Sequence, residues 1–210
     1  MSVTSKLTCK LLVITLTAII MINFHRMNAM KSSKCIYDIR KATMHDKENL
    51  KILYHRVASI LGGLARTKEE ITEAYIDKSL FNGINNGLAL VAEREGKLIG
   101  SIIKYKLEPK VFSHVLTEGS ILVDPDFQGK GIGSNLIITF LNEIKQNHPD
   151  ILRIEIMVRE SNPARKLYEK LEFKQEGRFE GRIKGADGKL EADIPMVWIN
   201  PRFGYINDQH

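Results

Sequence analysis

A strand, a glycine-rich loop and an amphipathic helix follow one another directly in the middle of this chain. The strand is expected over 115–125 (VLTEGSILVDP), the loop at 128–133 (QGKGIG) and the helix over 134–147 (SNLIITFLNEIKQN). This order aims several backbone N–H groups and the positive end of a helix dipole at one point, and glycines let the backbone approach a ligand closely. The pattern favours a site for a pyrophosphate. A tight turn that only packs the helix on the strand is the alternative.

Two known phosphate-binding loops are excluded by spacing. The P-loop ends in Gly-Lys-Ser/Thr, which is absent here, and the dinucleotide fingerprint GxGxxG fails because position 136 is Leu. The glycine-rich loop therefore belongs to neither class.

In the rest of the chain, segments with apolar residues at the spacing of a strand alternate with segments at the spacing of a helix. Alternating apolar residues and turn signals predict strands, and longer amphipathic runs with capping residues predict helices. The expected strands are 36–43, 88–95, 97–107, 115–125, 153–158 and two strands within 173–199 around a turn at 185–189; the expected helices are 46–61, 67–81, 134–147 and 164–173, with a turn at 82–87. This order predicts an α/β (α+β) domain with a central mixed sheet.

Composition limits the size of the domain and its partners. The chain has 210 residues, 43% of them hydrophobic, which suits one well-buried domain. The formal net charge is +6, but Lys6, Lys10 and Arg26 supply half of that excess within a first segment that has no acid. Acidic residues are interspersed elsewhere, so no nucleic-acid partner is expected. Cys9 and Cys35 lie in no metal-ligand spacing, and no metal is expected.

The first thirty residues form a separate segment. Residues 11–22 (LLVITLTAIIMI) follow Lys6 and Lys10 in the order of a secretory signal, but they are shorter than the ~20 residues that span a bilayer. Residues 1–30 are either a signal-like hydrophobic leader or an upstream stretch with the true start at Met27 or Met30. We expect a cytoplasmic protein, with export or membrane tethering as the alternative, and membrane contact only if residues 6–22 are retained.

The segment VDPDFQGKGIGSNL resembles the acetyl-coenzyme A motif of the GNAT N-acetyltransferase superfamily. Gln128, Gly131 and Gly133 occupy its defining positions, and ESNPARKLYEKLEF resembles the motif that follows it in the family. The resemblance implies a GNAT domain over 36–203, with a mixed, mostly antiparallel central sheet splayed between its fourth and fifth strands and helices on both faces. It also implies acetyl-coenzyme A as the cosubstrate.

The resemblance implies roles for individual residues. The backbone of two strand residues would bind the pantetheine arm, the loop would bind the pyrophosphate, and an asparagine would help to fix the arm. These cofactor-binding residues are Leu122, Val123, Gln128, Gly129, Lys130, Gly131, Gly133, Ser134 and Asn162. The Asn-to-Tyr spacing is one residue shorter than is common in the family, so Ser161 could share the role of Asn162.

Tyr168 is the expected catalytic acid and Glu118 the expected base. A phenol has an ordinary pKa near ~10, which suits protonation of a departing thiolate; the alternative for Tyr168 is a packing residue. Glu118 would act through water, and its alternative is a solvated strand residue. Glu155 is the next candidate for the base and His114 a further one. Met157 stands at the position where some relatives keep a carboxylate.

The expected function is transfer of an acetyl group from acetyl-coenzyme A to a primary amine of a small molecule or protein, by direct attack. The alternative is a non-catalytic module that binds acyl-coenzyme A. In the family the acceptor is set by the first two helices and the final hairpin, here 46–84 and 173–199, and no motif there identifies it. A homodimer is a further expectation from family analogy.

Overall fold

The computed structural model describes residues 36–60, 62–185 and 187–204. The chain divides into two compact units, Met1–Ile36 and Tyr37–His210, so the described residues form most of the second unit. The leader 1–30 lies outside the described residues. Every helix in the described ranges is too short or too polar to cross a lipid bilayer.

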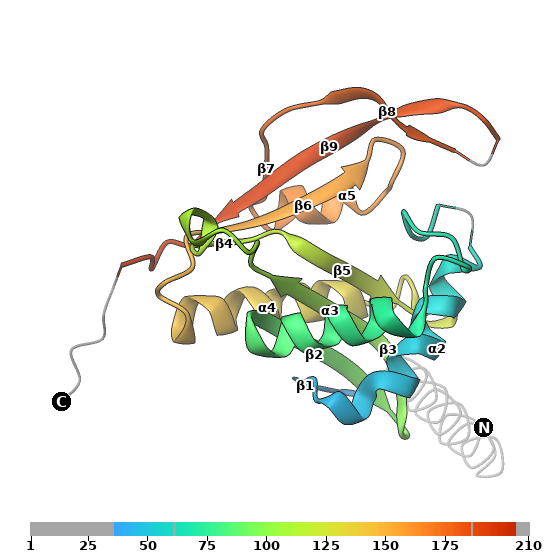
Figure 1. Ribbon diagram of the computed structural model, residues 1–210, viewed down its shortest axis with the longest axis horizontal. Coiled ribbons are helices and arrows are strands. Elements are labelled where there is room, and N and C mark those ends of the chain that lie inside the picture. Colours follow the sequence, from blue (N-terminus) through green and yellow to red (C-terminus); the bar gives the residue numbers. More distant parts are fainter. Residues whose placement is uncertain (1–35, 61, 186, 205–210) are drawn as a thin grey trace, which may run out of the picture. The chain divides into compact units, whose positions relative to one another are not determined.

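The second unit contains two β-sheets (Figure 1). The first is antiparallel, with the order β1-β2-β3-β5, formed by Asp38–Lys41, Gly87–Arg94, Lys97–Tyr105 and Glu118–Val123. The second has the order β4-β6-β9-β7, formed by Val115–Leu116, Arg153–Arg159, Leu190–Ile199 and Lys174–Gln175, with β8 (Phe179–Lys184) also paired to β9. This arrangement confirms the predicted mixed, mostly antiparallel fold.

The sheets separate along one stretch of chain, residues 115–123. Val115 and Leu116 of β4 pair in parallel with Arg153 and Ile154 of β6, whereas β5, which follows after Thr117, pairs with β3 alone. We call this divergence of β5 from β6 the fork. It is the predicted splay between the fourth and fifth strands, and the predicted single strand 115–125 is divided at Thr117.

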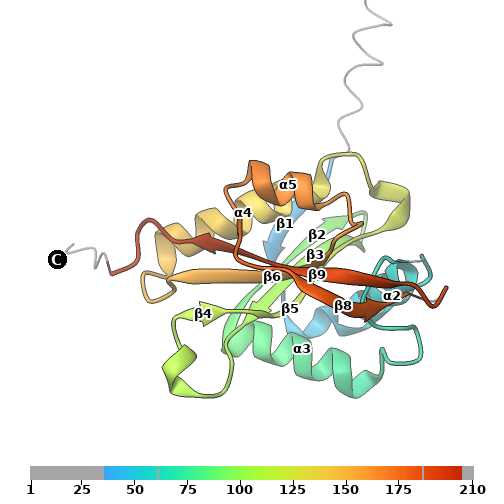
Figure 2. The ribbon, with the colours of Figure 1, turned by 90° about the horizontal axis from the view of Figure 1, so that it is seen from above.

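Helices cover both faces of the first sheet. In Figure 2, α2 (Lys47–Ala58) and α3 (Glu73–Asn85) lie on one side of the strands, and α4 (Ile132–Asn147) and α5 (Arg165–Lys170) on the other. The α4 helix buries Ile132, Leu136, Ile137, Phe140, Leu141 and Ile144, which recur at helical spacing. Burial of such side chains contributes about 1.5–3 kcal/mol each, so this stripe fixes the helix that carries the loop.

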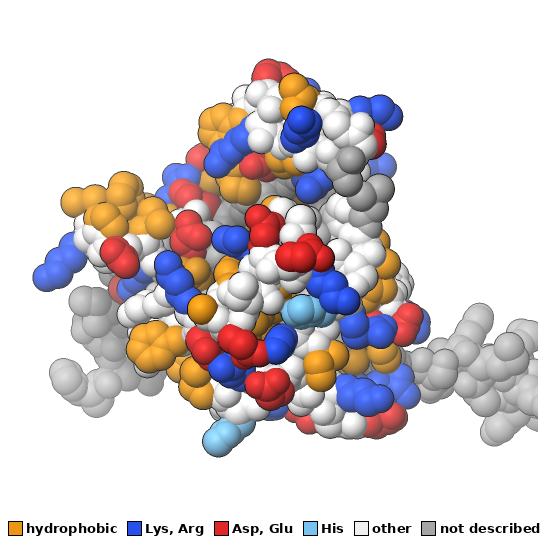
Figure 3. All heavy atoms as spheres, turned by 45° about the vertical axis from the view of Figure 1, so that its right-hand side comes forward, with side chains coloured by type: hydrophobic (Ala, Val, Ile, Leu, Met, Phe, Trp, Pro, Cys, Tyr) orange, Lys and Arg blue, Asp and Glu red, His pale blue; other side chains and the backbone are white. Residues whose placement is uncertain are grey.

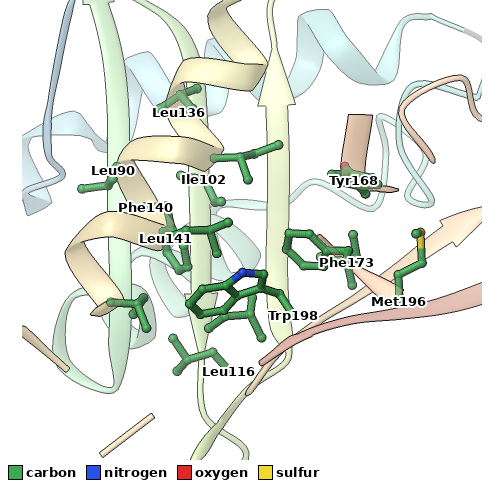
Figure 4. Packing of buried hydrophobic residues seen from close by; sticks show 14 of the residues in the cluster. Leu90, Ile102, Leu116, Leu136, Phe140, Leu141, Tyr168, Phe173, Met196 and Trp198 are labelled. Carbon is green, nitrogen blue, oxygen red and sulfur yellow. The ribbon is translucent and has the colours of Figure 1, made fainter. Parts of the chain in front are cut away.

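Hydrophobic residues pack on each face of the first sheet. On one face, residues of the first sheet form a hydrophobic cluster with residues of α4, α5 and the second sheet. Figure 4 shows Trp198, Phe173 and Leu116 close together within this cluster. On the other face, α2 and α3 pack against alternate residues of β2, β3 and β5, among them Val91, Ile103 and Leu122. The two clusters hold β5 from both sides.

One helix is displaced from its expected place. Thr67 and Glu70 do interact, because the Thr67 N–H donates to Glu70 Oε2 at 2.7 Å, but residues 67–71 form turns. The helix begins six residues later, where Thr72 Oγ1 accepts from Tyr75 N at 3.2 Å, and it runs to Asn85. The predicted turn at 82–87 is therefore wrong over its first four residues.

Candidate functional site

The first turn of α4 presents unpaired backbone donors. Gly131 is the N-cap, has φ +83°, and supplies no side chain to bond the helix start. Within the described part of the chain, the N–H groups of residues 131–134 have no acceptor, and the first bonded donor is Asn135 N, 3.0 Å from Gly131 O. A Cβ built on Gly129 or Gly131 would meet no atom within 4 Å. Free donors above open space fit an anion such as a pyrophosphate.

An aspartate ion pair fixes the loop from the strand side. Asp124 is buried at the end of β5; its Oδ1 accepts from Asp126 N at 3.0 Å, and Arg56 of α2 donates to both of its carboxylate oxygens at 2.6 and 2.9 Å. These bonds from Arg56 lower the pKa of Asp124 against the opposing effect of burial. The loop therefore begins at a charged residue that is held in place. The sequence signal for this anchor was the Asp-Pro pair that directly follows the strand.

The other predicted loop residues occupy distinct places. Gln128 Nε2 donates to Val123 O at 3.2 Å, and Lys130 Nζ donates to Asp126 O at 2.8 Å while lying 5.0 Å from the centroid of the Phe127 ring. A Cβ on Gly133 would come 3.3 Å from Val123 Cγ2, so this glycine lets α4 pack closely on β5. Ser134 is half-buried in the first helical turn.

The backbone of β5 alternates between β3 and the fork. Asp124 N donates to Ile99 O at 2.9 Å in the register that also places Val123 opposite Gly100 and Leu122 opposite Ser101. In an antiparallel ladder the next hydrogen-bonded residue is two positions away, so Leu122 faces β3. Ile121 and Val123 then direct their N–H and C=O groups toward the fork. The register thus turns the backbone groups of Ile121 and Val123, rather than those of the predicted Leu122, away from β3, and Val123 O there accepts from Gln128 Nε2.

Asn162 and Ser161 lie between β6 and α5. Asn162 Oδ1 accepts from Ala164 N at 2.9 Å, and no bond uses its Nδ2 within the described residues, so that amide N–H remains available as a donor. Ser161 donates its hydroxyl to Glu191 Oε2 at 2.6 Å. The structure thus leaves Asn162, rather than Ser161, with a free group for a pantetheine arm.

Tyr168 is buried beside Phe173, as Figure 4 shows, with their ring centroids 5.7 Å apart. Its hydroxyl has no hydrogen-bond partner among residues 36–60, 62–185 and 187–204. Burial raises the pKa of the phenol to about 12, so it is protonated at neutral pH. Tyr168 combines packing through its ring with a free donor at its tip.

The comparisons with known proteins agree with this geometry. Residues 85–175 match the family model described as an acetyltransferase (GNAT) domain. Over these residues the chain carries a GNAT acetyltransferase domain. The match spans the fork, the glycine-rich loop and Tyr168, and confirms the predicted family and enzyme class, of which acetyl-coenzyme A is the cosubstrate. No curated protein matches the sequence.

Solved structures share the fold of this GNAT domain. A GNAT-family acetyltransferase from Streptococcus pneumoniae has a TM-score of 0.70 at 22% identity, covering 78% of this chain and 99% of its own. A ribosomal-protein-alanine N-acetyltransferase from Brucella melitensis gives 0.66 at 23%, covering 77% and 99%. A phosphinothricin acetyltransferase from Sinorhizobium meliloti, in complex with acetyl-coenzyme A, gives 0.69 at 18%, covering 83% and 94%.

The candidate bases of the GNAT domain differ in their surroundings. Glu118 is exposed at the start of β5 and forms no ion pair with a described residue. Glu155 of β6 accepts from Arg153 Nε at 2.8 Å, and Met157 is exposed farther along the same strand. The His114 carbonyl accepts from Leu152 N at 2.9 Å, which places this residue at the start of β4. Glu118 is thus the carboxylate free to bond water or an amine.

Tyrosines of α2 and α3 lie over β5 on the side opposite α4. The Tyr54 hydroxyl and Ser120 Oγ hydrogen-bond each other, and the Tyr54 and Tyr75 rings meet edge to face at 5.6 Å. The Arg66 guanidinium lies 4.4 Å from the Tyr75 ring centroid. The sequence carried no signal for this group, because its members meet only in the folded chain. It borders the stretch of β5 that begins with Glu118.

Charges of both signs are mixed around these elements. Figure 3 shows Lys and Arg side chains interleaved with Asp and Glu over the face it presents. Lys47 bonds Asp77 at 2.8 Å, and Arg56 bonds Asp126 at 2.7 Å as well as Asp124. This face therefore carries local ion pairs rather than a field of one sign.

Proposed function

We propose that this GNAT domain transfers an acetyl group from acetyl-coenzyme A to a primary amine by direct attack. The observation that carries the proposal is the row of unpaired N–H groups at residues 131–134 beside the edge of β5 that pairs with no other strand. A diphosphate at the loop and an extended arm along the strand edge would satisfy both sets of donors.

The residues that hold the cosubstrate divide by chemistry. The amides of residues 131–134 and the open space at Gly129 and Gly131 suit the diphosphate, while Ile121, Val123 and the Asn162 amide suit the arm. Acetyl-coenzyme A supplies an acetyl group activated as a thioester. Holding it beside the acceptor makes the attack effectively unimolecular.

Two side chains handle protons in this proposal. Glu118, directly or through water, takes a proton from the acceptor ammonium, because only the free amine has a lone pair with which to form the C–N bond. As the C–S bond breaks, the Tyr168 hydroxyl donates a hydrogen bond to the sulfur. Its pKa of about 12 exceeds that of an ordinary thiol, near ~8.5, so the donor stabilises the thiolate while keeping most of its own proton.

An assay of the full chain with acetyl-coenzyme A and a panel of primary amines distinguishes an acetyltransferase from a non-catalytic binding module. Mass spectrometry of acetylated amine and free coenzyme A is the suitable measurement, since Cys9 and Cys35 would react with a thiol reagent. Turnover supports the enzyme. Tight coenzyme A binding without turnover on any amine would instead support a non-catalytic binding module, and absence of binding would end both readings.

The acceptor and the cellular placement belong to the same proposal. A small molecule or a protein is the acceptor class, and the panel should include both free amines and peptides. We also propose a cytoplasmic protein and a homodimer. Recovery of the uncleaved chain in a membrane fraction would contradict the first, and a monomeric mass in sedimentation would contradict the second.

A further inference from the structure

A lysine is buried at the closed end of the fork. Lys104 of β3 has 4% of its surface exposed, and its Nζ donates to Thr117 O at 2.7 Å. No carboxylate among the described residues lies within ion-pair distance of it. An ammonium has three donors and is costly to bury. One hydrogen bond does not offset that cost, so the presence of a lysine here instead of an apolar residue needs another explanation.

Thr117 is the residue at which the strand changes partner. Leu116, before it, pairs with Ile154 of β6, and Glu118, after it, pairs with Tyr105 of β3. Thr117 N donates to Tyr105 O at 3.2 Å, and Thr117 O accepts from Lys104. Both backbone groups of Thr117 are therefore occupied away from β6, and the ladder between β4 and β6 stops.

A glycine completes the change of direction. Gly119 has φ +114°, a conformation that other residues rarely adopt, and an added Cβ would clash with the Ile103 carbonyl oxygen. The kink at residues 117–119 thus has two supports, the glycine backbone and the lysine ammonium. This kink sets the direction in which β5 diverges from β6, and it thereby sets the position of Ile121 within the fork.

We propose that Lys104 is a positioning residue for acetyl transfer, which holds the Thr117 carbonyl so that the edge of β5 lies at the correct distance from β6. The inference rests on the proposed function. Lys104 does not contact the reacting atoms; it acts through the backbone of residues 117–121, where the arm of the cosubstrate binds.

The charge of Lys104 is disfavoured by burial and only partly offset by two carboxylates, one on each side of the fork. Burial lowers its pKa to about 8, and Glu118 of β5 and Glu155 of β6 oppose that shift. The ammonium is therefore charged at neutral pH and loses its proton within an accessible range. The turnover of the wild type should fall on the alkaline side near pH 8 for this reason, while coenzyme A affinity should not follow.

Lys104→Met and Lys104→Gln test the role as a pair. Both remove the charge, but only the glutamine amide can still donate toward Thr117 O. We expect kcat to fall at least tenfold in the Met variant and less in the Gln variant, with no lower melting temperature. Coenzyme A affinity should stay within threefold of wild type, because the amides of residues 131–134, which bind the diphosphate in the proposed function, do not depend on Lys104. The alkaline limb near pH 8 should be absent from both variants.

Hydrogen exchange supplies a readout that does not depend on turnover. Peptides covering 115–123 should exchange faster in Lys104→Met than in the wild type, whereas peptides from 132–147 should not change. Wild-type kcat in the Met variant, or parallel losses of melting temperature, affinity and turnover, would overturn the positioning role. If the wild type acetylates no amine, the proposed function fails by itself, and unchanged exchange at 115–123 would then reject Lys104 independently.

Discussion

At Tyr168, packing and proton chemistry act on one side chain. The ring packs on Phe173, and the same burial raises the pKa of the phenol to about 12. A residue kept only for packing would lose nothing when its hydroxyl is removed, because that hydroxyl bonds no described residue. The two interpretations of Tyr168 therefore differ in what a single oxygen contributes.

Tyr168→Phe should lower kcat by about tenfold or more and leave coenzyme A affinity unchanged, since the ring stays and only the donor is lost. Steady-state kinetics and calorimetric titration with coenzyme A measure the two effects. Phe173→Leu is the matched control, because it alters the packing partner and keeps the hydroxyl. Equal turnover in Tyr168→Phe and the wild type would leave Tyr168 as a packing residue.

Gly131→Trp should abolish coenzyme A binding, because the indole would fill the open space above the free amides of residues 131–134. Gly96→Trp is the control. Gly96 also has positive φ, +76°, and open space around it, but it lies in the turn between β2 and β3. Both variants carry similar backbone strain, of about 1–2 kcal/mol. Coenzyme A binding that survives in Gly131→Trp would show that the diphosphate lies elsewhere.

The helix α5 ends in a left-handed turn although the sequence has no glycine at that position. Where the family commonly has Leu-Gly-Phe, this chain has Leu171-Glu172-Phe173, and Glu172 adopts the left-handed conformation at φ +68°. Phe173 N donates to Tyr168 O at 3.0 Å and Glu172 N to Glu169 O at 3.1 Å, which is the Schellman pattern. The turn survives without its glycine, and it positions Phe173 against Tyr168.

Glu172→Gly should stabilise the protein by about 0.5–1 kcal/mol, because glycine adopts positive φ without the steric cost that Glu172 bears. Urea unfolding gives the difference. Glu169→Gly, one turn earlier within α5, should instead destabilise by about 1 kcal/mol, since glycine weakens a helix interior. A loss of stability in Glu172→Gly would mean that the glutamate side chain contributes more than its backbone strain costs.

Local patterns predicted the elements better than their junctions. The Glu95-Gly96 turn fixed the hairpin of β2 and β3, and α4 differs from its prediction only by starting at Ile132. The displaced start of α3 and the break at Thr117 depend on contacts across the fold. Thr67 and Glu70 formed their capping interaction without a helix. Thr117, where the strand changes partner, bonds Lys104 of another strand.

The candidate site divides in the same way. The glycine-rich loop was predictable because its donors come from consecutive backbone groups. The exchange of Leu122 for Ile121 follows from the register with β3, and the anchoring of Asp124 by Arg56 follows from the packing of α2. Neither relation leaves a periodic trace in the sequence.

For the whole molecule, the buried charge of Lys104 links stability to pH. Its pKa is about 8 in the folded chain and near ~10.4 in an unfolded one. Between these values the unfolded state binds more protons, so stability rises with pH. Below pH 8 the charged lysine costs its full penalty, about 3 kcal/mol. Above pH 10, Tyr105 and Tyr168 oppose the rise, because their raised pKa values make the folded state hold more protons.

The free energy of unfolding should therefore increase between about pH 8 and pH 10, and Lys104→Met should remove most of that increase. Urea unfolding of both proteins at several pH values across this window measures it. The Met variant should also be the more stable protein at pH 7, where the wild type buries an ammonium. A wild-type profile that falls from pH 8 to 10, or a rise of equal slope in both proteins, would assign the titration to another group. Greater stability combined with lower turnover in Lys104→Met would show that the fork keeps a destabilising charge for its use in acetyl transfer.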